Sequence, residues 1–146
     1  MDIALLNLAN KRLNDHILKC QLDRLIVSSI ELRLCFLTES IPKKEVWLTV
    51  SGAAWVDDKS EREANFFLQR GKFLSQVYML MGERIIDVEL HKDGQLLISI
   101  GQQKLVVEPD DESFEEVWSV TPESGSQFAE FDWFVTYTDN HELLVK

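Results

Sequence analysis

The first stretch of the chain carries its apolar residues mostly on one helical face. The apolar side chains of residues 3–13 are Ile3, Leu5, Leu6, Leu8, Ala9 and Leu13. Asp2 comes directly before this run, and its carboxylate is able to accept hydrogen bonds from the free N–H groups of a first helical turn. The pattern predicts a short N-terminal helix with Asp2 as its N-cap.

From Leu25 onward, apolar and polar residues alternate with a period of two. One face of a strand over residues 25–37 then carries four apolar side chains, Ile30, Leu32, Leu34 and Phe36, and the other carries Glu31, Arg33 and Cys35. After a turn that contains Pro42, alternation resumes with Val46, Leu48 and Val50. Two strands, residues 25–37 and 46–50, are predicted to pair with each other.

A central helix is predicted after a polar stretch at residues 57–63. Six apolar residues have roughly helical spacing there: Phe66, Phe67, Leu74, Val77, Tyr78 and Met81. Glycine is common just past a helix end and costly inside a helix. Gly71 and Gly82 are therefore expected to bracket the second half of this helix, residues 72–81.

A hairpin is the clearest local signal of the second half of the chain. Asp93-Gly94 separates two apolar runs, residues 85–90 and 96–100, and glycine supplies the positive backbone angle of a tight hairpin turn. Short strands are predicted at residues 105–107 and 117–120.

Residues 130–137 alternate again, which predicts one long C-terminal strand. The expected inward face is Phe131, Trp133, Val135 and Tyr137, and the expected outward face is Glu130, Asp132, Phe134 and Thr136. Together these elements predict a single α+β domain over residues 1–146: a mostly antiparallel sheet, one central helix and a short N-terminal helix.

Composition adds the class of protein and its compartment. The 146 residues are 45% apolar and 27% charged, as in ordinary soluble globular domains, and no apolar run reaches the length of a membrane helix. The basic residues Lys11 and Arg12 follow the first apolar stretch, the reverse of a secretory signal peptide. Cys20 and Cys35 are expected to be buried free thiols. These features indicate a cytoplasmic protein.

The net charge of the chain is concentrated in its last quarter. Residues 105–145 contain eleven carboxylates and no Lys or Arg, whereas residues 1–104 carry 14 basic and 14 acidic side chains. The formal net charge of −10 therefore comes from this last quarter, which also holds seven of the 14 aromatic residues. Nucleic acids and anionic membranes need a basic face, so a cationic partner is favoured. A solvated face that serves solubility alone is the competing interpretation.

The candidate partner-binding residues lie in two parts of this quarter. They are Asp110, Asp111, Glu112, Phe114, Glu115, Glu116, Trp118, Glu130, Asp132 and Phe134. Phe114 and Phe134 fall among acids and out of phase with the apolar faces, so we expect them to be exposed. Trp118 or Phe134 is the expected apolar anchor of an interface.

Motifs of catalysis and ligand binding are missing from the sequence. There is no glycine-rich phosphate loop, no GxSxG nucleophile turn and no calcium-loop spacing, and His16, His91 and His141 are far apart. His16 and Cys20 stand one helical turn apart, but two residues do not make a metal site. We therefore predict no enzymatic activity, no catalytic residue, no metal and no cofactor.

Several short motifs resemble small bacterial immunity proteins. They are Cys20-Gln-Leu, the strand at Trp47, Met81-Gly82-Glu-Arg-Ile-Ile, the strand pair around Asp93-Gly94, and Phe114 to Trp118. Those families neutralise polymorphic toxins, including the toxins of contact-dependent growth inhibition. The resemblance, over residues 16–121, implies a cytoplasmic single domain that binds a cognate toxin domain and blocks its active site or substrate surface. Many such toxins are nucleases with a basic cleft.

Two other classes of protein stay open. Acidic chaperones of type III secretion have similar size and charge, and they bind partly unfolded effectors as homodimers, whereas we expect a monomer here. An enzyme with residues dispersed along the sequence is the second alternative, and His91 near Asp93 at the hairpin tip is its one hint.

Overall fold

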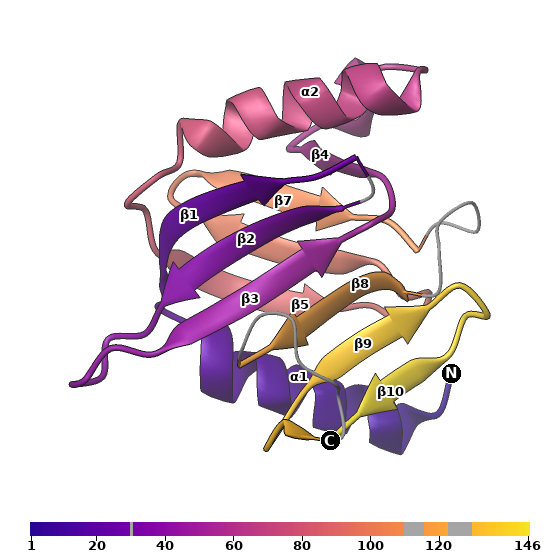
Figure 1. The fold of residues 1–146 in the computed structure, drawn as a ribbon. Helices are drawn as coiled ribbons and strands as arrows, with labels where there is room; N and C mark the ends of the chain where they lie inside the picture. The colour runs from indigo at the N-terminus through magenta and orange to yellow at the C-terminus, as the bar shows by residue number, and fades with distance from the viewer. Residues whose placement is uncertain (30, 110–115, 123–129) are drawn as a thin grey trace.

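A computed structural model describes residues 1–29, 31–109, 116–122 and 130–146 of the chain. Within these ranges the chain forms two α-helices and ten β-strands (Figure 1). In chain order they are α1 (Ile3–Ile17), β1 (Gln21–Val27), β2 (Leu32–Leu37), β3 (Glu45–Val50), β4 (Ala54–Val56), α2 (Phe66–Tyr78), β5 (Ile85–Leu90), β6 (Leu96–Ile100), β7 (Gln103–Val107), β8 (Glu116–Thr121), β9 (Val135–Thr138) and β10 (Leu143–Val145). A short 3₁₀ helix, η1 (Lys59–Glu61), precedes α2.

The strands form two sheets around a shared core. Their orders are β1-β2-β3-β8-β9-β10 and β4-β7-β6-β5, and every pairing among the described strands is antiparallel. Figure 1 shows the four-stranded sheet behind the six-stranded one, with α2 along the top of the view and α1 along the bottom. One cluster of buried apolar side chains draws on both sheets and both helices. The predicted α+β class is confirmed, but the sequence did not predict the division into two sheets.

Helix α1 begins and packs as its sequence predicts. The N–H of Ala4 donates a hydrogen bond to Asp2 Oδ1 at 2.8 Å, so the predicted N-cap is confirmed. Ala9, Leu13 and Ile17 are buried at four-residue spacing, and the helix contacts β5, β9 and β10. It extends to Ile17 because the buried face continues past the predicted end.

The predicted single strand over residues 25–37 is wrong, because the chain folds there into the hairpin β1–β2. The N–H of Ser28 donates to the carbonyl of Glu31 at 3.0 Å, and the N–H of Glu31 donates to the hydroxyl of Ser28 at 3.1 Å. Such local bonds compete with strand pairing, so Ser28 closes a turn inside an apolar run. The predicted pairing with residues 46–50 is confirmed for the second half of this segment, because Leu34 of β2 lies opposite Leu48 of β3.

Helix α2 runs without a break through Gly71, so the predicted boundary there is wrong. Asn65 caps the helix and accepts hydrogen bonds from the N–H groups of Phe67 and Leu68 at 2.9 and 3.1 Å. A glycine inside a helix costs about 1 kcal/mol relative to alanine. Burial of Phe73 on the same helix offsets that cost, because it removes a large apolar side chain from water.

The predicted hairpin around Asp93 and Gly94 is confirmed as β5–β6. Gly94 has a φ of +93°, which favours glycine. The N–H of His91 donates to the carbonyl of Gln95 at 2.9 Å, and the N–H of Gln95 donates to the Asp93 carboxylate at 3.0 Å. The tip is thus a compact turn held by its own backbone and by Asp93.

The long C-terminal strand predicted from residue 130 is wrong, although its predicted inward face is confirmed. Strand β9 begins only at Val135, and β10, which the sequence did not indicate, pairs with it. Phe131, Trp133, Val135 and Tyr137 are all buried, as predicted. Thr136, expected outside, is buried too, and its hydroxyl is satisfied there because it donates to the carbonyl of Trp118 at 3.0 Å.

The two cysteines are buried free thiols, as their apolar neighbours predict. Burial raises the pKa of Cys20 to about 11, so this thiol is protonated at neutral pH. Neither described helix is both long enough and apolar enough to cross a membrane.

Candidate partner-binding pocket

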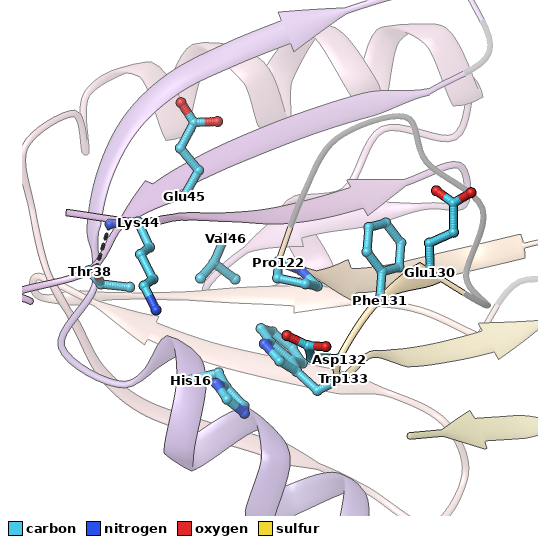
Figure 2. A pocket seen from close by; sticks show the side chains of 10 residues that line it. All are labelled: His16, Thr38, Lys44, Glu45, Val46, Pro122, Glu130, Phe131, Asp132 and Trp133. Atoms are coloured by element: carbon cyan, nitrogen blue, oxygen red, sulfur yellow. Dashed lines mark hydrogen bonds between the residues drawn. The ribbon is translucent and has the colours of Figure 1, made fainter. Parts of the chain in front are cut away.

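A pocket of about 750 Å³ opens where three parts of the chain meet. Its lining side chains, drawn in Figure 2, are His16 from α1, Thr38, Lys44, Glu45 and Val46 from the connection into β3, and Pro122, Glu130, Phe131, Asp132 and Trp133 from the C-terminal quarter. A cavity of this size is typical of sites that bind a small molecule or a peptide segment.

Two stacked rings form one wall of the pocket. The imidazole of His16 and the indole of Trp133 are parallel, with centroids 4.0 Å apart and 4° between the ring planes. The buried Leu13 anchors α1 one turn before His16. Arg12 holds the end of the chain against the same helix, because its Nε–H donates to the carbonyl of Lys146 at 3.1 Å. The stack therefore joins α1 to the C-terminal segment.

His16 contributes a ring to this wall but no charge at neutral pH. Burial lowers the pKa of His16 below its usual value of 6.5, and the positive charges of Arg12 and Lys11 act in the same direction. The carboxylate of Asp15 opposes them. Since a charged imidazole is disfavoured when water is removed from it, the ring that lies against Trp133 is the neutral form at pH 7.

The acidic side of the pocket consists of Glu130 and Asp132. Both side chains are exposed, and neither forms an ion pair with any residue that the structure describes. Asp132 and Trp133 line the same pocket, and Figure 2 shows the carboxylate of Glu130 apart from them. The two acids alternate with Phe131 and Trp133, which are buried. Negative charge and aromatic side chains thus line the same pocket.

Lys44 lies on the opposite side of the pocket. The backbone N–H of Lys44 donates to the hydroxyl of Thr38 at 2.9 Å, the dashed line of Figure 2. The backbone N–H of Thr38 donates to the carbonyl of Lys44 at 2.9 Å. These two bonds fix the start of β3, while Figure 2 shows the ammonium directed toward the pocket. No described carboxylate pairs with this ammonium. The pocket therefore has a cationic side and an anionic side.

Glu45 is the lining acid whose charge is already compensated. Its carboxylate accepts hydrogen bonds from the guanidinium of Arg24 and from the indole N–H of Trp47, the latter at 3.2 Å. Figure 2 shows this carboxylate directed away from the other lining side chains. Glu45 is consequently a structural residue rather than part of the acidic side.

The structure brings together only part of the predicted interface. Glu130 and Asp132 share the pocket, and the half-buried Phe134 follows them. Five predicted residues lie outside the described part of the chain: Asp110, Asp111, Glu112, Phe114 and Glu115. Glu116 begins β8, but its side chain is not described either.

The prediction that Trp118 anchors a partner is wrong. Its side chain is fully buried, at 0% exposure. The indole N–H donates to the carbonyl of Gly94 at 3.1 Å, and the ring stacks against Tyr137 with centroids 6.2 Å apart. Trp118 therefore joins the two sheets from inside the molecule and is not available at the surface.

Sequence reasoning missed His16 and Lys44 as parts of the site. The acidic and aromatic alternation at residues 130–133 pointed to one wall of the pocket, but not to what lies opposite it. His16 belongs to α1 and Lys44 to the start of β3, so only the packing of the sheets and helix brings them near Asp132. No local pattern around either residue carries that information.

The described residues contain no group of three or more His, Cys, Asp or Glu side chains that could hold a metal ion. The carboxylate of Asp93 accepts the turn bond from Gln95 described above, and His91 Nε2 lies 3.4 Å from Glu89 Oε1. The described contacts of Asp93 and His91 are thus with neighbouring residues of the same hairpin.

Comparisons of the chain with known protein families, with curated proteins and with solved structures find no match. The resemblance to immunity proteins therefore stays a prediction. The pocket has to be interpreted from its own geometry and charge.

Proposed function

We propose that this protein is a cytoplasmic immunity protein that binds a cationic toxin domain through its acidic C-terminal quarter and blocks that domain. One observation carries the proposal: Glu130 and Asp132 are exposed, have no ion pair among the described residues, and flank the aromatic wall of a pocket. Carboxylates without a partner beside a desolvated aromatic surface suit charge-assisted bonds to Arg and Lys of a second protein.

The charge distribution supports a partner with a basic cleft. The net charge of −10 comes from the last quarter of the sequence, so the molecule has an acidic part and a neutral part. Complementary charge raises protein association from about 10⁵–10⁶ to as much as about 10⁸–10⁹ M⁻¹s⁻¹ at low salt. A nuclease toxin has such a cleft because its substrate is anionic, and rapid capture protects the cell from it.

Co-expression with the toxin tests the proposal. The proposal predicts that a large secreted protein is encoded immediately upstream of this chain, and the C-terminal domain of that protein is the partner to use. Expression of that domain alone should stop growth, and this protein should restore growth and form a complex with it by isothermal titration calorimetry. A domain that is not toxic, or growth that is not restored, would contradict the proposal.

Matched variants locate the interface within the acidic quarter. The double variant Glu130→Gln/Asp132→Asn should weaken the complex about tenfold or more, because two charge-assisted bonds are lost. The control Asp139→Asn/Glu142→Gln removes the same charge from the β9–β10 turn, outside the pocket. Equal losses for both variants would indicate that only total charge matters and that the pocket is not the interface.

A chaperone of the type III secretion class is the second candidate, and exposed apolar residues favour it. Phe67, Leu68, Tyr78 and Met79 of α2 and its C-terminal cap are each more than 60% exposed, at 67%, 63%, 65% and 77%. Chaperones of this class work as homodimers. A monomer by multi-angle light scattering would exclude this candidate, while a stable dimer would favour it over the immunity protein.

A further inference from the structure

We propose that the pocket binds one arginine side chain of the protein partner, with its guanidinium between the carboxylate of Asp132 and the indole of Trp133. This inference rests on the proposed function, because it assumes a protein partner, and it names the group that the partner presents.

Two other tryptophans of the molecule each carry an arginine and an acid. The guanidinium of Arg24 lies over Trp47, 5.3 Å from the ring centroid, and binds Glu45. In the same way, Arg62 lies over Trp55 at 5.5 Å and binds Glu108. The arrangement combines a cation–π contact with a charge-assisted hydrogen bond to a carboxylate.

Trp133 differs from these two tryptophans, because an acid lines its pocket but no described arginine lies over its ring. Asp132 lines the same pocket as Trp133 (Figure 2), and no described arginine or lysine lies over the Trp133 ring. Trp118, the remaining tryptophan, is fully buried. Among the described residues, Trp133 is therefore the tryptophan that lines a cavity together with an unpaired carboxylate, and His16 covers one face of its ring.

Lys44 sets the orientation of the guest. Its ammonium repels a second cation, so the guanidinium belongs on the side of Asp132 and Glu130. A carbonyl or carboxylate of the partner, next to the arginine, suits the side of Lys44. The neutral imidazole of His16, stacked on Trp133, adds no repulsion at pH 7.

Arginine fits this pocket better than lysine. A guanidinium is planar, stacks on an aromatic face and binds a carboxylate through two parallel N–H groups, whereas an ammonium is a strongly hydrated point charge. The volume of about 750 Å³ exceeds what one side chain needs. The backbone around the arginine therefore enters the pocket as well, which is typical of a loop of a folded partner.

Binding of N-acetyl-L-argininamide, followed by NMR of the ¹⁵N-labelled protein, tests the inference without the toxin. The signal to follow is the indole N–H of Trp133, assigned by its loss in Trp133→Phe. We expect a saturable shift with a dissociation constant of about 1–10 mM, as for a single anchoring group. N-acetyl-L-lysinamide should bind several-fold more weakly, and N-acetyl-L-glutaminamide should cause no saturable shift.

Three variants make the test specific. Asp132→Asn should weaken argininamide binding about tenfold, because a charge-assisted hydrogen bond is lost, and Lys44→Met should strengthen it, because a repelling charge is removed. Glu142→Gln has the same charge change as Asp132→Asn but lies outside the pocket, so its binding should match the wild type. Shifts that do not saturate, equal binding of lysinamide, or unchanged binding by Asp132→Asn would overturn the inference.

The experiments distinguish failure of the arginine subsite from failure of the proposed function. Argininamide that does not bind, with a toxin complex that persists, would remove the arginine subsite and leave the immunity function standing. Saturable, Asp132-dependent binding without any toxin complex would leave the subsite and remove the function.

Discussion

At the scale of single residues, two glycines of this chain have opposite roles. Gly94 has a positive φ, and a Cβ added to it would lie 2.4 Å from Cζ of Tyr137. Gly71 lies in the middle of α2, and a Cβ added there has no atom within 4 Å. The first position therefore needs glycine for both backbone and space, whereas the second tolerates any good helix former.

Replacement of each glycine by alanine should change stability in opposite directions. Gly94→Ala should lower the free energy of unfolding by about 2–4 kcal/mol, because it combines a strained backbone with a displaced aromatic ring. Gly71→Ala should raise it by about 0.5–1 kcal/mol. Urea denaturation followed by tryptophan fluorescence measures both. A Gly94→Ala protein as stable as the wild type would contradict the close packing of the hairpin tip.

His16 should make stability depend on pH. Its pKa in the folded protein is lowered from 6.5, so the unfolded chain binds the proton more tightly. The free energy of unfolding is then highest above pH 6.5 and falls as the pH drops below that value, until the folded pKa is passed. His16→Phe keeps a ring against Trp133 but has no proton to bind. Its stability should fall less between pH 7 and 5.5, and an equally steep fall would exclude His16 as the cause.

At the scale of elements, α1 covers an edge of the four-stranded sheet. Nδ2 of Asn10 donates to the carbonyl of Leu90 at 3.0 Å, and the N–H of Leu90 donates to Oδ1 of Asn10 at 2.7 Å. One side chain thus satisfies both backbone groups of an edge residue of β5. This bond pair also sets the position of the helix that carries His16 to the pocket.

Loss of the Asn10 amide should loosen this contact. Asn10→Ala leaves the two backbone groups of Leu90 without their partner, and this should cost about 1–3 kcal/mol of stability. Asn14→Ala is the control, because the bond from Asn14 to the carbonyl of Val88 is long, at 3.5 Å, and its loss should cost much less. Thermal unfolding and hydrogen exchange at Leu90 measure the difference. Equal effects of the two variants would show that the edge bonds contribute little.

Two element boundaries were predicted correctly from single residues, whereas the boundary predicted at Gly71 and those that depend on strand pairing were wrong. Asp2 and Gly94 act through their own side chain or backbone, and both predictions are confirmed. The turn between β1 and β2 begins at Ser28, inside an apolar run. The alternation of apolar and polar residues gives no sign of that turn. Residues 131–133 alternate in burial outside any strand, and only Phe134 already exchanges backbone hydrogen bonds with Lys146, so alternation alone overestimated the last strand.

At the scale of the whole molecule, the charge asymmetry is expected to guide the approach of the proposed cationic partner. The acidic quarter acts over roughly one Debye length, about 8 Å at physiological salt. Charges at the rim of an interface act mainly on the association rate, whereas charges inside it act on dissociation. The acidic run at residues 110–116 and the pocket acids are therefore expected to have separable effects on the proposed toxin complex.

Stopped-flow association with the toxin domain tests this separation. Neutralisation of Asp110, Asp111, Glu115 and Glu116 together should lower the association rate about tenfold at low salt, with little change in the dissociation rate. The difference from wild type should vanish at about 0.5 M salt, where screening removes long-range attraction. An unchanged association rate at low salt would exclude the acidic run from the encounter.

The sequence by itself determined the local features of this protein: the start of α1, the β5–β6 hairpin, the buried face of residues 131–137 and the segregation of charge. Each depends on the period of the apolar pattern or on one residue's own conformation. Only the tertiary structure decided that there are two sheets, that Trp118 is buried against Gly94 and Tyr137, and that His16 and Lys44 lie near Asp132. An apolar pattern indicates that one face of a helix or strand is buried. Which element covers that face depends on contacts between residues far apart in the chain.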